Sequence, residues 1–175
     1  MTIRNILLLS ALALSLSAPA AWAGMPDDIR DGALIEMEGN VLDKATVMAT
    51  ELEVTTGMAG EDGIKGIIEV VNPSERTVVI AGVTVIAEAD ALIQDEENMP
   101  MEFSGFVIGR RGKAEGKYEN GIIMASRVKM KRFKEGRENE IELIGQATKV
   151  NRKGESFTLL GKEVLVTPTT VVEVE

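Results

Sequence analysis

The chain contains no cysteine and no histidine. Without cysteine it has neither a disulfide framework nor a thiolate nucleophile. Without histidine it lacks the side chain that most often acts as a general base or a metal ligand. Carboxylates are abundant, but pairs such as Glu36 with Glu38 and Glu140 with Glu142 lie two residues apart, as they do on the solvated face of any acidic strand. We therefore predict that the protein is not an enzyme.

Aromatic residues are scarce: one tryptophan, one tyrosine and four phenylalanines. Proteins that bind single-stranded nucleic acid combine a basic groove with aromatic side chains on which the bases stack. Near the most basic part of this chain there are only Tyr118, Phe103, Phe106 and Phe133. The formal net charge of −9 also repels polyanions in general. We predict no nucleic-acid partner.

The longest apolar run, from Ile6 to Leu16, is too short to span a bilayer. It follows the positive charge of Arg4 and precedes the small-residue site Ala21-Trp22-Ala23. This pattern predicts that residues 1–23 are a cleaved signal peptide, and no cysteine follows it that would carry a lipid anchor. The mature protein is expected to be periplasmic or secreted, without a membrane span. It would begin with a polar lead-in at residues 24–33, which we expect to be mobile.

A stretch of the chain occurs twice. The segment Gly66-Ile-Ile-Glu-Val-Val-Asn72 matches Gly145-Gln-Ala-Thr-Lys-Val-Asn151, and each copy reaches a second glycine ten residues later, at Gly82 and Gly161. Matched glycines and matched apolar positions indicate one supersecondary unit used twice. In the first copy, β-branched runs around a small Ala81-Gly82 turn predict three strands over residues 66–72, 77–81 and 83–88.

A second, looser repeat flanks the first. Residues 37–54 resemble residues 103–130 through a Gly-x-Val element and a Met-Ala element, which stands at Met48-Ala49 and Met124-Ala125. Each copy predicts two strands, and the second would hold about ten extra residues, from Arg110 to Asn120, at its hairpin tip. The mature chain thus reads as β throughout.

Three strands and two strands make the inventory of a small five-stranded OB-like barrel. We therefore predict an all-β fold of two such barrels. Residues 64–132 would form one, and residues 34–56 plus 141–172 would form the other by end-to-end closure, since barrels leave no exposed edge. In the alternative, each two-strand unit pairs with the three-strand unit that follows it.

The repeat resembles a family of exported bacterial OB-like β-barrel repeats classed as a domain of unknown function. The resemblance lies in Gly-x-Ile/Ala-x-x-Val-Asn, the β-branched strand, the second glycine and the following Val-x-Val/Ala, together with the Met-Ala-x-x-Val element. It covers nearly all of residues 35–172. It implies an OB-like fold and an envelope location, and it brings no catalytic residue.

Charge is unevenly distributed along the chain. Between Arg110 and Arg137 there are ten basic residues and three glutamates, inside a protein that is otherwise acidic. Such a ribbon predicts a docking surface for an envelope protein or another anionic partner. The candidate contact residues are Arg110, Arg111, Lys113, Lys117, Arg127, Lys129, Lys131 and Arg132. Alternatively, the ribbon pairs with acids of the same chain, such as Glu36, Glu38, Glu51 and Glu53. The sequence defines no oligomeric state.

One segment has a possible ligand character. Met99 and Met101 flank Pro100, and two thioethers so placed can hold the soft ion Cu(I). The stretch is similar to the Met-x-Met-x-Phe segment of small OB-fold periplasmic copper chaperones, but those proteins add a histidine and a tryptophan that the mature chain lacks. Periplasmic Cu(I) binding is therefore the alternative function, and methionines as pliable core fillers are the ordinary interpretation. No other cofactor is predicted.

Overall fold

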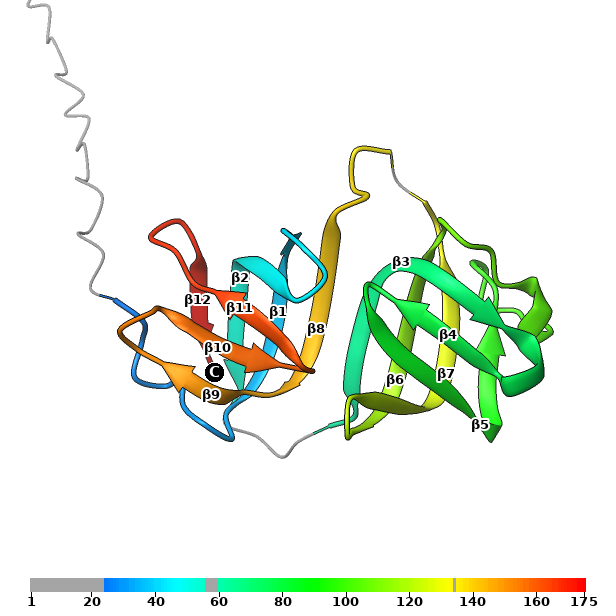
Figure 1. The fold of residues 1–175 in the computed structure, drawn as a ribbon, viewed down its shortest axis with the longest axis horizontal. Helices are drawn as coiled ribbons and strands as arrows, with labels where there is room; N and C mark the ends of the chain where they lie inside the picture. Colours follow the sequence, from blue (N-terminus) through cyan, green and yellow to red (C-terminus); the bar gives the residue numbers. More distant parts are fainter. Residues whose placement is uncertain (1–23, 56–59, 134) are drawn as a thin grey trace, which may run out of the picture.

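The computed structural model describes residues 24–55, 60–133 and 135–175, so the signal peptide assigned to residues 1–23 lies outside the described residues. In the described ranges the chain is all-β, as predicted (Figure 1). The strands are β1 (Leu34–Val41), β2 (Thr46–Thr55), β3 (Asp62–Asn72), β4 (Thr77–Ile80), β5 (Val83–Gln94), β6 (Arg111–Glu119), β7 (Ile122–Lys131), β8 (Glu140–Gln146), β9 (Thr148–Asn151), β10 (Ser156–Leu159), β11 (Lys162–Leu165) and β12 (Val171–Val174). Two short 3-10 turns are η1 (Pro73–Glu75) and η2 (Phe103–Gly105).

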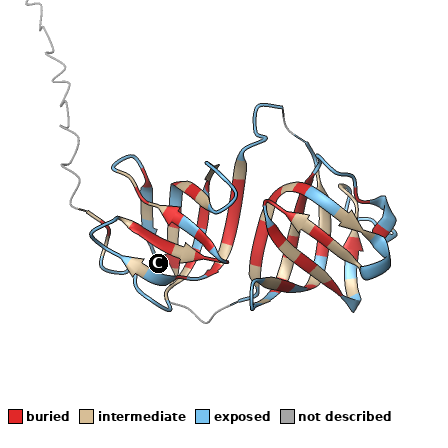
Figure 2. Ribbon diagram, viewed as in Figure 1, coloured by how far each residue is buried: buried red, intermediate tan, exposed pale blue. Residues whose placement is uncertain are grey.

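Strands β3 to β7 form a closed five-stranded barrel (Figure 1, green to yellow). Strand β3 pairs with β4 on one side and with β6 on the other, while β5 pairs with β4 and, in parallel, with β7. Strands β6 and β7 complete the ring as an antiparallel hairpin. Along much of these strands buried residues alternate with more exposed ones (Figure 2). The buried set includes Ile64, Ile68, Val78, Ile80, Val85, Ile123 and Val128. The ring leaves residues 63–65 of β3 with a second free side, which pairs with β8 outside the ring.

The additional strands bring the two ends of the described chain together. Strand β1 pairs antiparallel with β2 and with β8, and β2 pairs in parallel with both β11 and β12. Strands β11, β10 and β9 then follow as an antiparallel meander. Strand β9 begins one residue after β8 ends, with the buried Ala147 between them. The N-terminal strands therefore find their partners in residues 140–174.

A short antiparallel ladder between β3 and β8 joins the two groups of strands into one sheet. Its register pairs Gly63 with Ile144, Ile64 with Leu143 and Lys65 with Glu142. Ile64 is 1% exposed and Leu143 is 0% exposed, so the centre of the junction is closed to solvent. The side chains on either side of that central pair point the opposite way, toward the outer surface.

The sequence repeat is also a repeat of backbone conformation. The turn between β4 and β5 has positive φ at Ala81 (45°) and Gly82 (78°), and the turn between β10 and β11 has the same pair at Leu160 (46°) and Gly161 (77°). Two successive positive φ values are typical of the tight type I′ hairpin turn, whose twist matches that of its flanking strands. The hairpin predicted at Ala81-Gly82 is thus confirmed, and the glycine in each copy supplies the second left-handed residue.

The alignment of the looser repeat is wrong in one of its strands. Phe103-Ser-Gly105 lies in η2, not in a strand, and the residues treated as an inserted hairpin tip are strand β6. The true counterparts are Gly39 and Gly116, which both sit at a register shift in the β1–β2 and β6–β7 hairpins. A β-bulge needs a glycine where the partner backbone comes close. The sequence comparison matched the local pattern Gly-x-Val, and it did not consider where a bulge requires a glycine.

The lead-in at residues 24–33 is docked, which contradicts the expected mobility. Ile29 is 0% exposed and Met25 is 8% exposed. The Arg152 guanidinium donates hydrogen bonds to the carbonyl oxygens of Met25, Pro26, Asp27 and Ile29, over distances of 3.0–3.3 Å. One fixed fork of donors thus satisfies four backbone acceptors and holds the segment against the β9–β10 turn.

Because the ring of β3 to β7 is closed, it carries its own core and needs no strand from elsewhere. We expect a fragment of residues 60–140 to fold on its own and to unfold cooperatively in urea. A fragment of residues 24–59 contains only β1 and β2 and is expected to be unfolded, because an isolated hairpin is marginal in water. Amide chemical-shift dispersion in two-dimensional NMR spectra measures both outcomes. An unfolded 60–140 fragment would show that the barrel depends on its β3–β8 junction.

Candidate functional site

Charged side chains form a row across the outer surface of six neighbouring strands. Cross-strand partners point to the same side of a sheet, so the registers fix which residues are neighbours. Following the ladders from β2 through β1, β8, β3 and β6 to β7, the row reads Glu51, Glu38, Glu142, Lys65, Lys113, Lys129. The residues that alternate with these, such as Met37, Leu52 and Ile64, are buried. The row therefore lies on the outside of the sheet.

A second row runs beside the first, from carboxylates on β2 and β1 to a cation on β7, with the carboxylate of Glu115 on β6 before it. It reads Glu53, Glu36, Ile144, Gly63, Glu115, Arg127. We call this surface the charged face. Its acidic arc is Glu36, Glu38, Glu51 and Glu53 on β1 and β2, and its basic arc is Lys113, Arg127, Lys129 and Lys131 on β6 and β7. The change from acidic to basic falls at the β8–β3 junction.

Within each arc, like charges stand directly opposite one another. Glu36 is paired with Glu53, Glu38 with Glu51, and Lys113 with Lys129. Such pairs destabilise a sheet. Burial, together with repulsion from Glu142 and Glu53, raises the pKa of Glu36 above its ordinary value. Burial, together with repulsion from neighbouring lysines, Lys129 first, lowers the pKa of Lys131. Glu36 on the acidic side and Lys131 on the basic side thus lie in surroundings that disfavour their charges.

Two glutamates neutralise part of the basic side. Glu142, 9% exposed, forms an ion pair with Lys65, and its other oxygen lies 3.8 Å from the Lys113 Nζ. Glu115 lies 3.0 Å from the Lys113 Nζ and 2.8 Å from the Arg127 Nη1. Burial alone would raise the pKa of the Glu115 carboxyl, but these two cations outweigh it and lower that pKa. The basic arc is therefore held in place by acids on β6 and β8.

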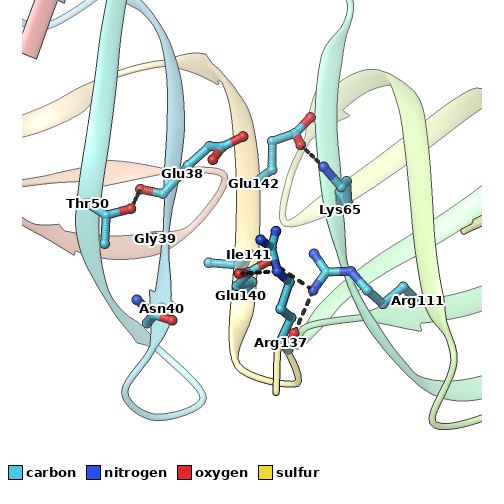
Figure 3. A pocket seen from close by; sticks show the side chains of 10 residues that line it. All are labelled: Glu38, Gly39, Asn40, Thr50, Lys65, Arg111, Arg137, Glu140, Ile141 and Glu142. Carbon is cyan, nitrogen blue, oxygen red and sulfur yellow. Dashed lines mark hydrogen bonds and ion pairs between the residues drawn. The ribbon is translucent and has the colours of Figure 1, made fainter. Parts of the chain in front are cut away.

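A polar pocket of about 190 Å³ opens where the two arcs meet (Figure 3). Its lining includes Glu38, Lys65, Arg111, Arg137, Glu140 and Glu142. The Arg111 guanidinium donates to the carbonyl oxygen of Arg137 at 2.6 Å and lies 3.7 Å from the Glu140 carboxylate. A neighbouring hollow of about 380 Å³ is lined by five cations and two carboxylates: Lys65, Arg111, Lys131, Arg132, Arg137, Glu96 and Glu140. The junction side of the basic arc is therefore recessed and mainly cationic.

The predicted ribbon does not form one surface. Lys113, Arg127, Lys129 and Lys131 lie together on the charged face. Arg111 is 5% exposed and occupied by its bonds to Arg137 and Glu140, so its assignment as an exposed contact residue is wrong. Arg132 lines the hollow beside Lys131 and pairs with Glu97 at 3.2 Å. Lys117 pairs with Glu119 at 2.6 Å, and Arg110 is exposed just before β6.

The intramolecular alternative is only partly right. In the described ranges, the ion pairs of the ribbon are made with Glu97, Glu115, Glu119, Glu140 and Glu142. Of the acids proposed as partners, none of Glu36, Glu38, Glu51 and Glu53 forms an ion pair there, because both arcs point outward from the same face. Sequence analysis missed Lys65 and the role of Glu142, since their pairing depends on the β3–β8 ladder.

The two methionines of the copper hypothesis lie on the connection between β5 and β6. Met99 is 61% exposed, whereas Met101 is partly buried and packs against the core. The Met101 backbone N–H donates to the Ile93 carbonyl at 3.1 Å. Among the residues the structure describes, no three Asp or Glu side chains converge to hold a metal ion. Cu(I) binding stays a prediction that these contacts do not strengthen.

No protein-family model, no curated protein sequence and no solved structure matches this chain. The resemblance to exported OB-like repeats therefore stays a prediction. In the described part of the chain, no helix combines the length and apolar character needed to cross a membrane. The functional argument rests on the chemistry of the charged face itself.

The repulsion within the arcs has a measurable cost to stability. We expect Glu36→Gln and Lys131→Gln each to raise the urea midpoint at pH 7. The gain in the free energy of unfolding should be about a few tenths of a kcal/mol, because both groups are screened by solvent. The Glu36 pKa is raised above 4.5 on folding, so the charged carboxylate destabilises the folded state. This destabilisation is absent well below pH 4.5 and fully present at pH 7. The Lys131 pKa is lowered below 10.5, so its penalty holds at pH 7 and fades as the pH approaches 10.5.

The matched controls are Glu88→Gln and Lys153→Gln, which change the same charges at exposed positions away from the face. They are expected to leave the midpoint unchanged. A loss of stability in Glu36→Gln or Lys131→Gln would mean that the arcs support the fold, and that their like charges are compensated.

Proposed function

We propose that the mature chain is an exported, non-enzymatic binding or assembly module of the cell envelope. It is built from two OB-like barrels, and its basic arc contacts an anionic partner. The strand order of the closed ring, β3-β4-β5-β7-β6 with β5 and β7 parallel, is the order expected of an OB-like barrel. The leader-like first 23 residues support the envelope location.

Matching registers support a second barrel of the same design. The parallel pair Val85–Ile123 in β5–β7 corresponds to Val164–Val47 in β11–β2. Likewise the pair Gly66–Gly112 in β3–β6 corresponds to Gly145–Ile35 in β8–β1. In this proposal β8 and β9 together take the place of the single long strand β3, and the N-terminal hairpin takes the place of β6 and β7.

The observation that carries the binding proposal is the basic arc. Lys113 stands opposite Lys129, and Lys131 lies among other lysines. These like-charge contacts destabilise the sheet, and of the three lysines only Lys113 forms ion pairs in the described ranges, with Glu115 and Glu142. Charges that oppose local stability are expected where a protein is adapted to a partner. The side chains stand on paired strands, so their spacing is fixed before binding. A fixed array of cations steers and orients an anionic surface.

The carboxylates give little support for a catalytic alternative. Paired acids that act as general acid and base are usually held in a cleft that shifts their pKa values apart. Here Glu36, Glu38 and Glu51 are exposed on an open sheet face. They therefore suit contact with another charged surface better than proton transfer to an enclosed substrate.

The test is affinity capture from an envelope extract at matched low salt. The mature protein is compared with a charge-reversed form carrying Arg127→Glu, Lys129→Glu and Lys131→Glu. The matched control reverses Lys117, Lys149 and Lys153, which gives the same net charge with the face intact. Wild type and control are expected to retain the same anionic partner, and the face variant is expected to lose it. Equal capture by all three would remove the basic arc from the proposal.

A further inference from the structure

The two halves of the sheet are related by an internal two-fold axis. Ile64 and Leu143 occupy the same position in the two copies of the repeat, and they are paired with each other at the centre of the β3–β8 ladder. An antiparallel pair of equivalent residues has a two-fold axis perpendicular to the sheet between its strands. This axis exchanges Lys65 with Ile144 and Gly63 with Glu142. It therefore also exchanges the strands that flank β3 and β8.

Three pairs of equivalent positions on the charged face carry opposite charges. Lys113 is paired with Lys65, and Glu36 is paired with Ile144, so Lys113 and Glu36 are equivalents. One strand further out, Lys129 corresponds to Glu53, and Arg127 corresponds to Glu51. The fourth acid, Glu38, corresponds to Glu115, which is also acidic, and Lys131 corresponds to Thr55. The duplicated framework thus repeats one set of positions and exchanges cations for carboxylates at three of them.

Glu36 and Lys113 attract each other across the junction, but no ion pair links the two arcs of one chain in the described ranges. Both point outward from the same face, on opposite sides of the junction. In the described ranges the four acidic-arc glutamates form no ion pair, and Lys129 bonds only to the side-chain oxygen of Asn98. The acidic and basic arcs of one chain cannot be brought into contact with each other. The arcs of two copies can.

We propose that two copies of this chain associate through their charged faces, with the acidic arc of each copy on the basic arc of the other. A two-fold axis in the plane of the face, at right angles to the line that joins the arcs, turns each row end for end. It places cations over Glu38, Glu51 and Glu53 at both ends at once, and one carboxylate, Glu115, over Glu36. This is an isologous contact, which forms a closed dimer and does not propagate. The inference rests on the proposed function, because it identifies the anionic partner as the acidic arc of a second copy.

Salt sets the conditions under which the contact forms. At about 0.1 M salt the Debye length is about 10 Å, so facing arcs attract while the rest of each negative surface is largely screened. At about 1 M salt the Debye length is about 3 Å, and the attraction between the arcs is lost as well. Association is therefore expected at moderate salt and dissociation at high salt, which is the opposite of an apolar dimer.

The test is sedimentation equilibrium of the mature protein at 0.1 M and 1 M salt, with two charge-reversed variants. Glu51→Lys with Glu53→Lys cancels the net charge of the acidic arc, and Arg127→Glu with Lys129→Glu cancels that of the basic arc. Each variant alone loses the attraction at both ends of the contact, so we expect its dimer dissociation constant to rise at least about tenfold. An equimolar mixture pairs the intact basic arc of one variant with the intact acidic arc of the other. The mixture is expected to recover a dimer, which also proves that both variants are folded.

Several results would overturn the inference. They are a wild type that remains monomeric at 0.1 M salt, a dimer unaffected by both reversals, and variants that do not associate on mixing. A monomeric wild type that still captures an anionic envelope component through its basic arc would refute self-association alone and leave the proposed function standing. Loss of both self-association and capture would remove the proposed function as well.

Discussion

Gly116→Ala is expected to destabilise the protein by about 3 kcal/mol, the upper part of the range for overpacking substitutions. A Cβ atom at this position would lie 2.0 Å from the Met124 carbonyl oxygen and 2.7 Å from the Ala125 Cα. Both atoms belong to the backbone of β7, so no side chain can turn aside to make room. The hairpin would have to open at the bulge, where β6 and β7 change register. The urea midpoint at constant pH measures the loss.

Gly39→Ala makes the same change in the other hairpin, with a Cβ 2.3 Å from the Met48 carbonyl oxygen. We expect a similar loss, because the two glycines have the same role in β1–β2 and β6–β7. The control is Gly60→Ala, where nothing lies within 4 Å of the added carbon. It should change stability by less than about 0.5 kcal/mol. An unchanged midpoint in Gly116→Ala would show that the strands tolerate a regular pairing without the bulge.

Features that depend on a few consecutive residues could be predicted from the sequence. The repeated Gly82 and Gly161 turns and the β-branched strands before them follow from local backbone preference. The turn at Asn72-Pro73 is confirmed as η1, where Arg76 takes a positive φ of 51°. The matching residue Glu155 has φ 49°, although its type gives no hint of this. Local chemistry therefore predicted the hairpins and the all-β class.

Features that depend on strands far apart in sequence were not predicted. Strand β6 has a glycine, a lysine or a glutamate at most of its positions, so it lacks the apolar alternation that marks a strand. Its partner β3 supplies the hydrogen-bonding edge and the apolar contacts instead. No pattern in the sequence predicts the β3–β8 ladder either, since both strands also have other partners. For this reason neither the recessed Arg111 nor the Lys65–Glu142 pair could be placed.

The charge pattern itself was visible in the sequence, but its geometry was not. Both the basic ribbon and the acidic pairs were identified; the ribbon was predicted to be a docking surface, and pairing with those acids was the alternative. The internal two-fold axis instead sets them side by side on one outer surface. Duplication explains this outcome physically, because equivalent strands must present their side chains in the same direction from the sheet. A charge pairing within the chain would have required the two halves to fold face to face.

Glu142→Gln is expected to lower stability by about 2 kcal/mol. This carboxylate lies between Lys65 and Lys113 at the junction and is 9% exposed. Removing one partner of a buried ion pair typically costs about 3–5 kcal/mol, because the remaining charge is left without compensation. The cost is reduced here, since the Lys65 and Lys113 side chains are 29% and 26% exposed, and since repulsion of Glu36 is relieved. The urea midpoint at pH 7 gives the difference.

Two further variants identify the cause. Glu119→Gln removes a carboxylate from an exposed pair with Lys117 and is expected to leave the midpoint unchanged. Lys65→Met combined with Glu142→Gln removes both partners at the junction, and a coupling of about 1 kcal/mol in the double-mutant cycle is expected. Absence of coupling would mean that the backbone ladder alone holds β3 to β8. A positive coupling makes this ion pair the fixed point between the arcs, so that the acidic and basic sides keep their spacing when a second surface approaches.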